Sequence, residues 1–259
     1  MNGVGVDASF PVVRDVDRVR RLVALPDVKP AMLDKLAGAT VAIVGMGGLG
    51  CASAPYLAAA GVGRLVLIDP GRVAATDLGR QILYGPTDVG ELKVDVAASR
   101  LLRQHPRLAL VREPVALAAD NAAALLEGVS AVVDGLDDGA ARDVLNAWAV
   151  RGGGPVVFGG ALGYEGQVAV VPPGGRPCLA CLFGSVAEAP TECSVEGVLG
   201  PLVGVVGSLQ AAEALKWLLG VGGVLTGRLW LLDLFTGATR VVPIPARTGC
   251  AVCGGAEAV

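Results

Sequence analysis

Three observations predict an α/β fold with a doubly wound, mainly parallel sheet. The 259 residues are 53% hydrophobic and only 17% charged, as expected for apolar strands that are covered on both faces. Strand-like apolar runs alternate with helix-like segments over the first two-thirds of the chain, which is typical of right-handed βαβ units. A glycine-rich turn joins the first of these strands to the first long helix. Together these features predict a Rossmann-like sheet that binds its ligand at the carboxyl ends of the strands.

The expected elements follow in a regular order. A buried strand at 41–44 leads through the glycines to an Ala-rich helix at 49–60, and a second strand follows at 64–68. The rest of the parallel part is expected to contain helices at 89–104, 120–127 and 139–150 and strands at 108–112, 131–133 and 155–158. After Gly159, strands at 167–171, 228–232 and 239–244 are expected to extend the sheet in antiparallel fashion, because no helix separates the last two. The uncharged segment 197–212 is too short for a membrane span and is interpreted as a buried helix.

The chain is expected to be one domain with a short preface. Residues 1–35 are charged and weakly periodic and are interpreted as an arm or a helical preface, and residues 36–259 as a single domain that ends in a cysteine-rich subregion. Met1 to Arg21 contains no apolar core of a secretory signal, which predicts a cytoplasmic protein. The net charge of −3 leaves no basic face for nucleic acid and no polybasic membrane patch.

The glycine-rich turn predicts a nucleotide site. Gly45, Gly47 and Gly50 have the G-x-G-x-x-G spacing, and Gly48 lies between them. Glycines at these positions permit a tight turn and let backbone N–H groups approach a phosphate at the positive end of a helix. Asp69 ends the second strand, where an acid binds the ribose hydroxyls in such folds.

Four of the six cysteines form two C-x-x-C pairs, Cys178 with Cys181 and Cys250 with Cys253. Two such pairs supply four thiolates in the tetrahedral arrangement that zinc prefers. The single histidine, His105, is distant in sequence and no coordination position is left open, so a structural zinc site is expected. Four reduced or redox-active thiols are the alternative.

The ordered motifs resemble those of the ThiF/MoeB-type adenylyltransferases of the ubiquitin-activating-enzyme superfamily. The resemblance runs from about Arg18 to Cys253. The motifs that carry it are Arg18–Arg21 with Leu25 and Pro26, Gly45–Gly50, Gly61–Gly63 leading to Asp69, Arg80 with Gln81, Val89 and Gly90 with Lys93, Asp134–Asp138, the first cysteine pair, Cys193 with Gly197–Pro201, Gly207–Gln210, and the second cysteine pair.

The resemblance implies ATP-dependent activation of a carboxylate. In such enzymes the C-terminal glycine of a small ubiquitin-like carrier protein, ending in Gly-Gly, attacks the α-phosphorus of ATP and pyrophosphate leaves. By motif position, Asp69 is the candidate ribose ligand and Asp137 the candidate Mg²⁺ ligand. Arg80 and Lys93 are the candidate phosphate cations, with Gln81 beside them in the nucleotide site. The expected function is adenylation of a sulfur carrier, which prepares it for thiocarboxylate formation in cofactor or specialised metabolite biosynthesis.

Two further residues take their expected roles from the resemblance. Arg21 matches an N-terminal arginine that reaches the ATP site of the partner subunit, which implies a homodimer. Cys193 matches a cysteine that forms a covalent link to the carrier in some members and is dispensable in others, so a nucleophile and a bystander both stay open.

The chain departs from the family pattern at several positions. Gly71 stands where a second acid is usual, and Asp77 stands where an asparagine is usual. Asp137 is followed by Asp138, whereas an asparagine usually follows the aspartate at this place. Three alternatives therefore remain: adenylation of a peptide or other carboxylate, a catalytically inactive nucleotide-binding partner subunit, and a dinucleotide oxidoreductase. The last would explain the glycine turn and Asp69 but neither the cations nor the cysteine pairs.

Overall fold

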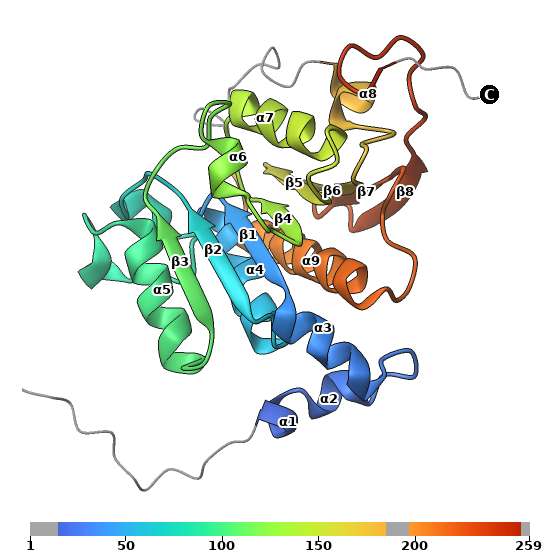
Figure 1. The fold of residues 1–259 in the computed structure, drawn as a ribbon. Coiled ribbons are helices and arrows are strands. Elements are labelled where there is room, and N and C mark those ends of the chain that lie inside the picture. The colour runs from blue at the N-terminus through green and yellow to red at the C-terminus, as the bar shows by residue number, and fades with distance from the viewer. Residues whose placement is uncertain (1–14, 185–196, 255–259) are drawn as a thin grey trace, which may run out of the picture.

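The structure, a computed structural model, describes residues 15–184 and 197–254. Within them, eight strands form one sheet in the order β3-β2-β1-β4-β5-β6-β7-β8 (Figure 1). The strands are β1 (Thr40–Val44), β2 (Arg64–Ile68), β3 (Ala109–Glu113), β4 (Ala131–Asp134), β5 (Val156–Leu162), β6 (Glu165–Val171), β7 (Arg228–Asp233) and β8 (Ala238–Pro243). The α-helices are α1 (Asp15–Arg18), α2 (Arg20–Val23), α3 (Leu33–Gly38), α4 (Gly48–Ala59), α5 (Lys93–Gln104), α6 (Ala122–Leu125), α7 (Gly139–Val150), α8 (Leu179–Phe183) and α9 (Gly200–Leu219), and short 3₁₀ turns are η1 (Pro30–Met32), η2 (Ala75–Asp77) and η3 (Pro86–Asp88).

The sheet has a parallel half and an antiparallel half. β1 pairs in parallel with β2 on one side and with β4 on the other. β3 pairs in parallel with β2, and β5 pairs in parallel with β4. β5, β6, β7 and β8 then pair in antiparallel order through hairpins and a crossover. The predicted mixed sheet is confirmed, including its antiparallel C-terminal strands.

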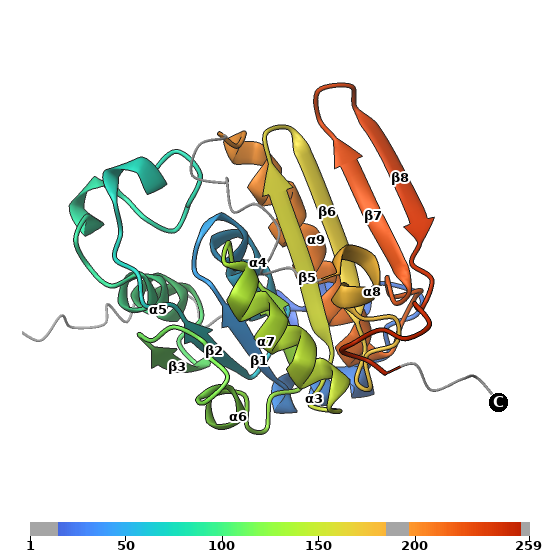
Figure 2. The same ribbon diagram turned by 90° about the horizontal axis from the view of Figure 1, so that it is seen from above.

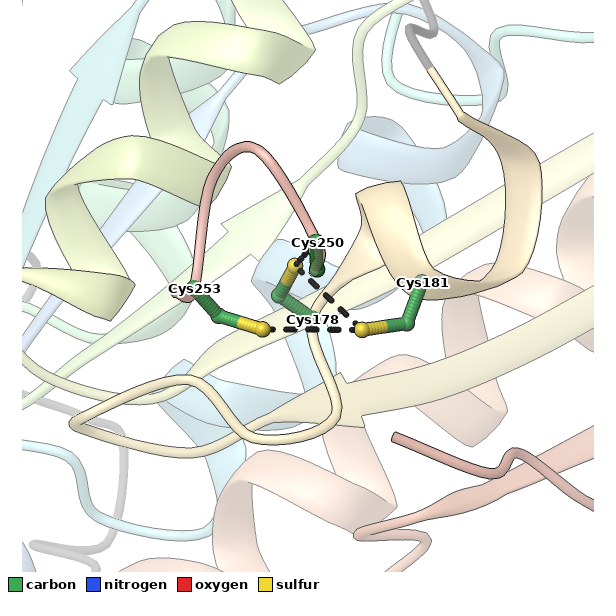
Figure 3. A group of neighbouring side chains, drawn as sticks. All are labelled: Cys178, Cys181, Cys250 and Cys253. Carbon is green, nitrogen blue, oxygen red and sulfur yellow. Dashed lines mark hydrogen bonds between the residues drawn. The ribbon is translucent and has the colours of Figure 1, made fainter. Parts of the chain in front are cut away.

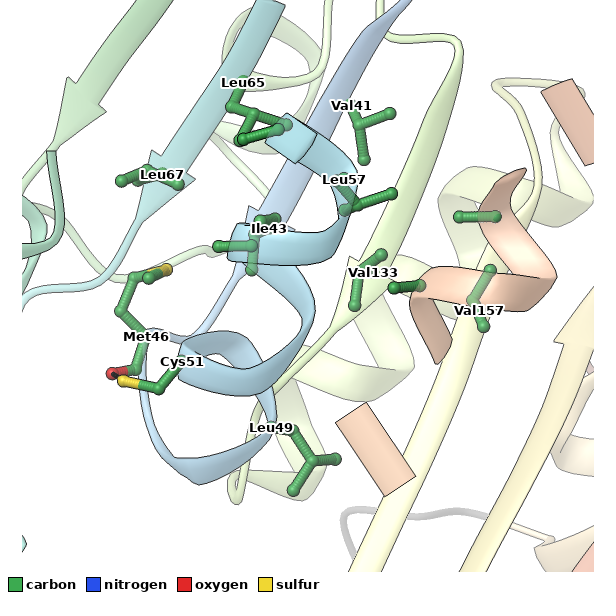
Figure 4. Close-up of a cluster of buried hydrophobic side chains, with 14 of the residues drawn as sticks. Val41, Ile43, Met46, Leu49, Cys51, Leu57, Leu65, Leu67, Val133 and Val157 are labelled. Carbon is green, nitrogen blue, oxygen red and sulfur yellow. Dashed lines mark hydrogen bonds between the residues drawn. The ribbon is translucent and has the colours of Figure 1, made fainter. Parts of the chain in front are cut away.

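Helices cover both faces of the sheet (Figure 2). Side chains alternate along each strand, so Val41 and Ile43 belong to the core on the side of α4, α5 and α9 (Figure 4). Ala42 and Val44 belong to the core on the opposite face, on the side of α6, α7 and α8. Leu57 of α4 is fully buried in the first of these cores. Burial of a side chain of this size contributes about 1.5–3 kcal/mol, which explains why nearly every position of the central strands is apolar.

Two core helices, α4 and α9, touch at a glycine. A Cβ on Gly207 would lie 2.5 Å from the Leu49 carbonyl oxygen and 2.8 Å from the Ala52 Cβ. By length and composition α9 could also cross a membrane, but half of its most apolar window is buried inside the protein. The interpretation of this segment as a buried helix is confirmed, with α9 beginning three residues later and ending seven residues later than the predicted range of 197–212.

Several predicted boundaries are wrong for local reasons. The helix expected from 89 begins at Lys93, because Gly90 has a positive φ of 95° and Leu92 is extended. The helix expected at 120–127 is confined to Ala122–Leu125. The strand expected at 155–158 continues to Leu162, where Gly163 turns the chain into β6. The short helix α8, which begins directly after Cys178 and includes Cys181, is too short to give a periodic signal.

Candidate functional site

A cavity of about 820 Å³ lies at the carboxyl ends of the parallel strands. Its wall contains the ends of β1 and β2, the turn after β4 and the second half of β5. Small-molecule sites usually measure about 300–1,000 Å³, so this cavity has the size that a nucleotide requires. Its position matches the ligand site predicted from the strand order.

The glycine loop forms one wall of the cavity. Gly45 has a φ of 92°, and a Cβ there would lie 2.5 Å from the Gly135 carbonyl oxygen. A Cβ on Gly50 would lie 2.1 Å from the Gly45 carbonyl oxygen, so these two glycines are required by the turn itself. Around Gly47, which lines the cavity, no atom would come closer than 3.9 Å to an added Cβ. The open space therefore lies on the side from which a phosphate would approach the first turn of α4.

Met46 anchors this loop through both of its backbone polar groups. Its N–H donates to Asp69 Oδ2 at 2.6 Å, and its carbonyl accepts from the Tyr84 hydroxyl at 2.8 Å and from Cys51 Sγ at 3.5 Å. Burial raises the pKa of Tyr84 well above its ordinary value, so the phenol stays protonated and remains a donor. The loop is thus held in place before any ligand binds.

Asp69 lines the cavity with both carboxylate oxygens engaged. Besides Met46, the Gly71 N–H donates to Asp69 Oδ1 at 2.6 Å. Each carboxylate oxygen has a second lone pair, which leaves acceptor capacity for a ribose hydroxyl. A Cβ on Gly71 would lie 2.8 Å from Asp69 Oδ1 and 3.6 Å from the Lys93 stem, so a side chain at position 71 would crowd both residues.

The two predicted phosphate cations meet at one carboxylate. Asp77 Oδ1 lies 3.2 Å from Arg80 Nη2, and its Oδ2 lies 3.4 Å from Lys93 Nζ. Gln81 Nε2 donates to Asp77 Oδ1 at 2.8 Å. Asp77 is buried, and all four residues line the cavity. The negative charge that departs from the family pattern is therefore offset by the same cations that would receive a phosphate.

The three aspartates at the end of β4 and in the turn after it, Asp134, Asp137 and Asp138, have different surroundings. Asp138 is the N-cap of α7 and accepts from the Ala140 and Ala141 N–H groups at 3.1 and 3.2 Å. Asp134 is fully buried. Asp137 is exposed, lines the cavity, and has no hydrogen bond to another described residue. Of the three, Asp137 has the free carboxylate that a hard cation needs.

Arg142, which the sequence reasoning missed, binds the turn after β4. Its Nε lies 3.2 Å from Asp134 Oδ2, and Nη2 donates to the carbonyls of Leu136 and, at 2.9 Å, Gly159. Its guanidinium carbon lies 5.0 Å from the centroid of the Phe158 ring. Burial raises the pKa of Asp134, and the Arg142 charge opposes that rise. The available signal for it was an arginine in the first turns of an Ala-rich helix, eight residues after the strand-ending Asp134.

The four paired cysteines converge at a second place, beside β5–β8 (Figure 3). Their sulfur atoms all lie within 4.8 Å of one another, and the separations include 3.7 Å for Cys178–Cys250 and 3.5 Å for Cys181–Cys253. A tetrahedral zinc site with bonds of about 2.3 Å needs sulfur separations of about 3.8 Å. The donor set and its spacing therefore fit a closed metal site. Burial raises the pKa of the Cys178 thiol.

Of the remaining predicted site residues, one lies away from the cavity and the other cannot be placed. Arg21 lies exposed on α2 and does not line it. Cys193 lies outside the described residues. The role of each stays a prediction.

Comparison with known proteins decides the family. The sequence model of the ThiF family matches residues 19–252. The chain belongs to the ThiF family. It is 41% identical over 247 residues to the sulfur carrier protein adenylyltransferase of Thermus thermophilus. This alignment covers 93% of this chain and 91% of that protein. It is also 41% identical to the molybdopterin-synthase adenylyltransferase of Escherichia coli, over 85% of this chain and 89% of that one.

Longer relatives match over part of their length. The adenylyltransferase and sulfurtransferase MOCS3 of Aedes aegypti is 40% identical over 92% of this chain but only 55% of its own, so the ThiF-family chain spans about half of it. Solved structures of Escherichia coli MccB with ATP and of PaaA superpose with TM-scores of 0.76 and 0.77 at 23% and 22% identity. The MccB match covers 86% of this chain and 69% of that one, and the PaaA match 92% and 87%. At this identity they show the fold alone.

Family membership decides the class of activity. The relatives of this ThiF-family chain are named adenylyltransferases, and the chain is accordingly an enzyme of that class that uses ATP. An oxidoreductase with the same glycine turn would need neither Arg80 nor Lys93 beside the loop. The dinucleotide alternative is therefore excluded by the family, and the peptide-adenylating and inactive-subunit alternatives are not favoured.

Proposed function

We propose that this protein adenylates the C-terminal glycine carboxylate of a ubiquitin-like sulfur-carrier protein. The observation that carries the proposal is the convergence of Arg80 and Lys93, from separate segments, at one carboxylate beside the glycine loop. The named activities of the relatives, which cover nearly the whole chain, support the same substrate class. The acyl-adenylate then prepares the carrier for thiocarboxylate formation.

The reaction exchanges one phosphorus–oxygen bond for another. A carboxylate oxygen of the carrier attacks the α-phosphorus, the bond to the bridging oxygen of the β-phosphate breaks, and pyrophosphate leaves with that electron pair. The glycine loop and the first turn of α4 present N–H groups to the phosphates, and Asp69 accepts from the ribose. Arg80 and Lys93 compensate the charge that develops on the departing pyrophosphate.

Asp137 is proposed to hold Mg²⁺, because its carboxylate is exposed at the cavity wall and free of hydrogen bonds to other described residues. Magnesium bound there would neutralise phosphate charge. Asp138 fixes the start of α7 and so the position of Asp137.

A second hollow of about 290 Å³ offers an approach for the carrier tail. It is lined by the antiparallel strands and shares Gly160, Ala161, Leu162 and Gln167 with the nucleotide cavity. The hairpin ends beside it carry Tyr164 and Phe235, whose ring centroids are 5.5 Å apart and which are 49% and 78% exposed. We propose that the carrier rests on these rings and that its Gly-Gly tail runs through the shared wall.

The remaining assignments are structural. We propose zinc at Cys178, Cys181, Cys250 and Cys253, a homodimer in which Arg21 reaches the partner's site, and a cytoplasmic location. The four sulfurs leave no position open for substrate, so a metal there would tie the C-terminal segment to the middle of the chain.

Pyrophosphate exchange tests the function. The protein is incubated with ATP, Mg²⁺ and labelled pyrophosphate, with and without a carrier that ends in Gly-Gly. Exchange that depends on the carrier is expected, and Arg80→Ala should lower it by about 10²-fold or more because a transition-state cation is lost. Absence of exchange with every Gly-Gly carrier would overturn the proposal, and exchange supported by a short peptide instead would revive the peptide alternative.

A further inference from the structure

Helix α7 links the nucleotide cavity to the cysteine cluster. Its first turn carries Arg142, which binds the turn after β4. One turn later, on the same side of the helix, Asn146 is completely buried. The Leu179 N–H donates to Asn146 Oδ1 at 2.9 Å, and Leu179 follows the metal-ligand candidate Cys178. The amide of Asn146 is therefore fixed against the backbone of the first cysteine pair.

The other end of this amide is unsatisfied. Asn146 Nδ2 is buried and has no hydrogen-bond partner among the described residues. Buried side-chain amides without a partner are rare, because their desolvation is costly. An unpaired donor held beside a cluster of sulfur atoms therefore calls for an acceptor at that place.

A cysteine thiolate is the acceptor that the surroundings supply. Cys178 directly precedes Leu179, whose N–H donates to the Asn146 oxygen, so the Asn146 amide lies beside the residue that carries this sulfur. A neutral thiol is a weak acceptor, whereas a metal-bound thiolate carries the charge that strengthens an N–H···S bond. Another cysteine of the cluster already accepts an N–H···S bond, because the Arg247 backbone N–H donates to Cys181 Sγ at 3.4 Å.

We propose that Asn146 Nδ2 donates a hydrogen bond to the Cys178 thiolate of the metal-loaded site and so acts as a positioning residue for the metal. The proposal rests on the metal site proposed above. It gives the buried amide both of its partners, one on the backbone of the cysteine pair and one on the sulfur. Because Asn146 and Arg142 share α7, the same amide also ties the metal site to the helix that borders the nucleotide cavity.

Two variants separate the donor from the acceptor. Asn146→Asp keeps the oxygen that accepts from Leu179 and removes the N–H donor, and Asn146→Leu removes both without adding charge. Asn121→Asp is the matched control, because Asn121 also binds the backbone but lies on the α6 turn, far from the cysteines in sequence. Metal content and the rate of zinc release to a chromogenic chelator are measured on the purified full-length proteins, with thermal unfolding as a check of the fold.

The expected result is wild-type zinc retained by Asn121→Asp and release about tenfold faster or more in both Asn146 variants, the range typical when a hydrogen bond to a metal ligand is lost. Release at the wild-type rate from Asn146→Asp would overturn the proposal, because that variant lacks the donor. Fast release from Asn146→Asp alone would also overturn it, since added charge would then be the cause. A wild-type protein that holds no metal would instead contradict the proposed zinc site itself.

Spectroscopy keeps the test decisive if Asn146→Leu does not fold. In protein loaded with ¹¹³Cd, the Asn146 side-chain proton should correlate with the metal through the sulfur, and this correlation should vanish in Asn146→Asp. A cadmium-loaded wild-type protein whose Asn146 amide exchanges with solvent as fast as an exposed amide would contradict the hydrogen bond.

Discussion

Asp77 sets the charge of the nucleotide site at the scale of a single residue. Its carboxylate pairs with Arg80 and Lys93 and accepts from Gln81, so the two cations are held together at one carboxylate. An incoming triphosphate must compete with Asp77 for both of them. The carboxylate thus orients the cations and weakens their hold on phosphate at the same time.

Asp77→Asn should tighten ATP binding. Removal of one negative charge beside the phosphates is expected to lower the KM for ATP about three- to tenfold, or about 0.6–1.4 kcal/mol, and the gain should shrink as salt is added. Asp88→Asn is the control, because Asp88 pairs with Arg100 at 2.7 Å outside the cavity lining. Pyrophosphate exchange at varied ATP measures both. Weaker binding in Asp77→Asn would mean that orientation of the cations outweighs their neutralisation.

Cys51 illustrates a cysteine whose chemistry is suppressed by its surroundings. It is fully buried at the start of α4, and burial raises the pKa of its thiol to about 12. Since the folded pKa lies above the ordinary value near 9, the stability gained from the neutral buried thiol is present below pH 9 and is lost as the pH rises toward 12.

Alkylation should reveal this suppression. Because the thiolate is the reactive form, Cys51 in the folded protein should resist iodoacetamide at pH 8 and react after unfolding. Mass spectrometry of the peptide that contains Cys51 reports its modification separately from the other cysteines. Rapid labelling of folded protein at pH 8 would show that the helix start opens to solvent.

The antiparallel hairpins matter at the scale of elements. β5–β6 and β7–β8 extend the sheet beyond the nucleotide cavity and place Tyr164 and Phe235 at adjacent ends, joined by the hydrogen bond from the Leu234 N–H to the Tyr164 carbonyl. A ring that is 78% exposed contributes little to the stability of the chain. Its free apolar surface is consistent with a protein partner.

Phe235→Asp should weaken carrier binding selectively. An exposed aromatic anchor at an interface contributes about 2 kcal/mol, so the KM for the carrier is expected to rise about tenfold or more, while ATP binding and thermal stability change little. Val241→Asp is the matched control, because Val241 is 49% exposed on β8 but lies on the opposite face from Arg240, which lines the hollow. Equal losses in both variants would point away from the hairpin ends as the docking surface.

At the scale of the whole molecule, the site is predicted to need two chains. Arg21 lies on α2, outside the cavity of its own chain, and the family resemblance assigns it to the partner's ATP site. In a dimer that combines one Arg21→Ala subunit with one Arg80→Ala subunit, both substitutions would then fall in the same site and leave the other site intact.

A mixture of the two inactive variants should therefore regain activity. Random exchange of subunits makes about half of the dimers mixed, and each mixed dimer has one intact site, so about a quarter of wild-type exchange activity is expected. The measurement is pyrophosphate exchange after the variants are mixed under conditions that allow subunit exchange. A mixture no more active than its components would place Arg21 in its own subunit's site or outside catalysis.

Most of the fold could be predicted from local patterns, because apolar runs and helical periodicity depend on neighbouring residues. The strand at 64–68 and the helix at 139–150 were predicted at their observed boundaries. The helix expected from 89 was misplaced, since Gly90 breaks it in a way that composition does not reveal. The division into a preface of residues 1–35 and one domain stays a prediction.

The sequence by itself determined the chemistry: the glycine turn, Arg80 and Lys93, the acidic cluster and the two cysteine pairs are motifs whose spacing is local. Only the tertiary structure decided how these groups act on one another. It paired both cations with Asp77, assigned Asp138 to a helix cap and left Asp137 free, and brought Arg142 and Asn146 into contact with segments far away in the sequence. The physical reason is that charge pairing, desolvation and unsatisfied donors depend on which atoms are neighbours in space, and chain folding, rather than sequence order, sets those neighbours.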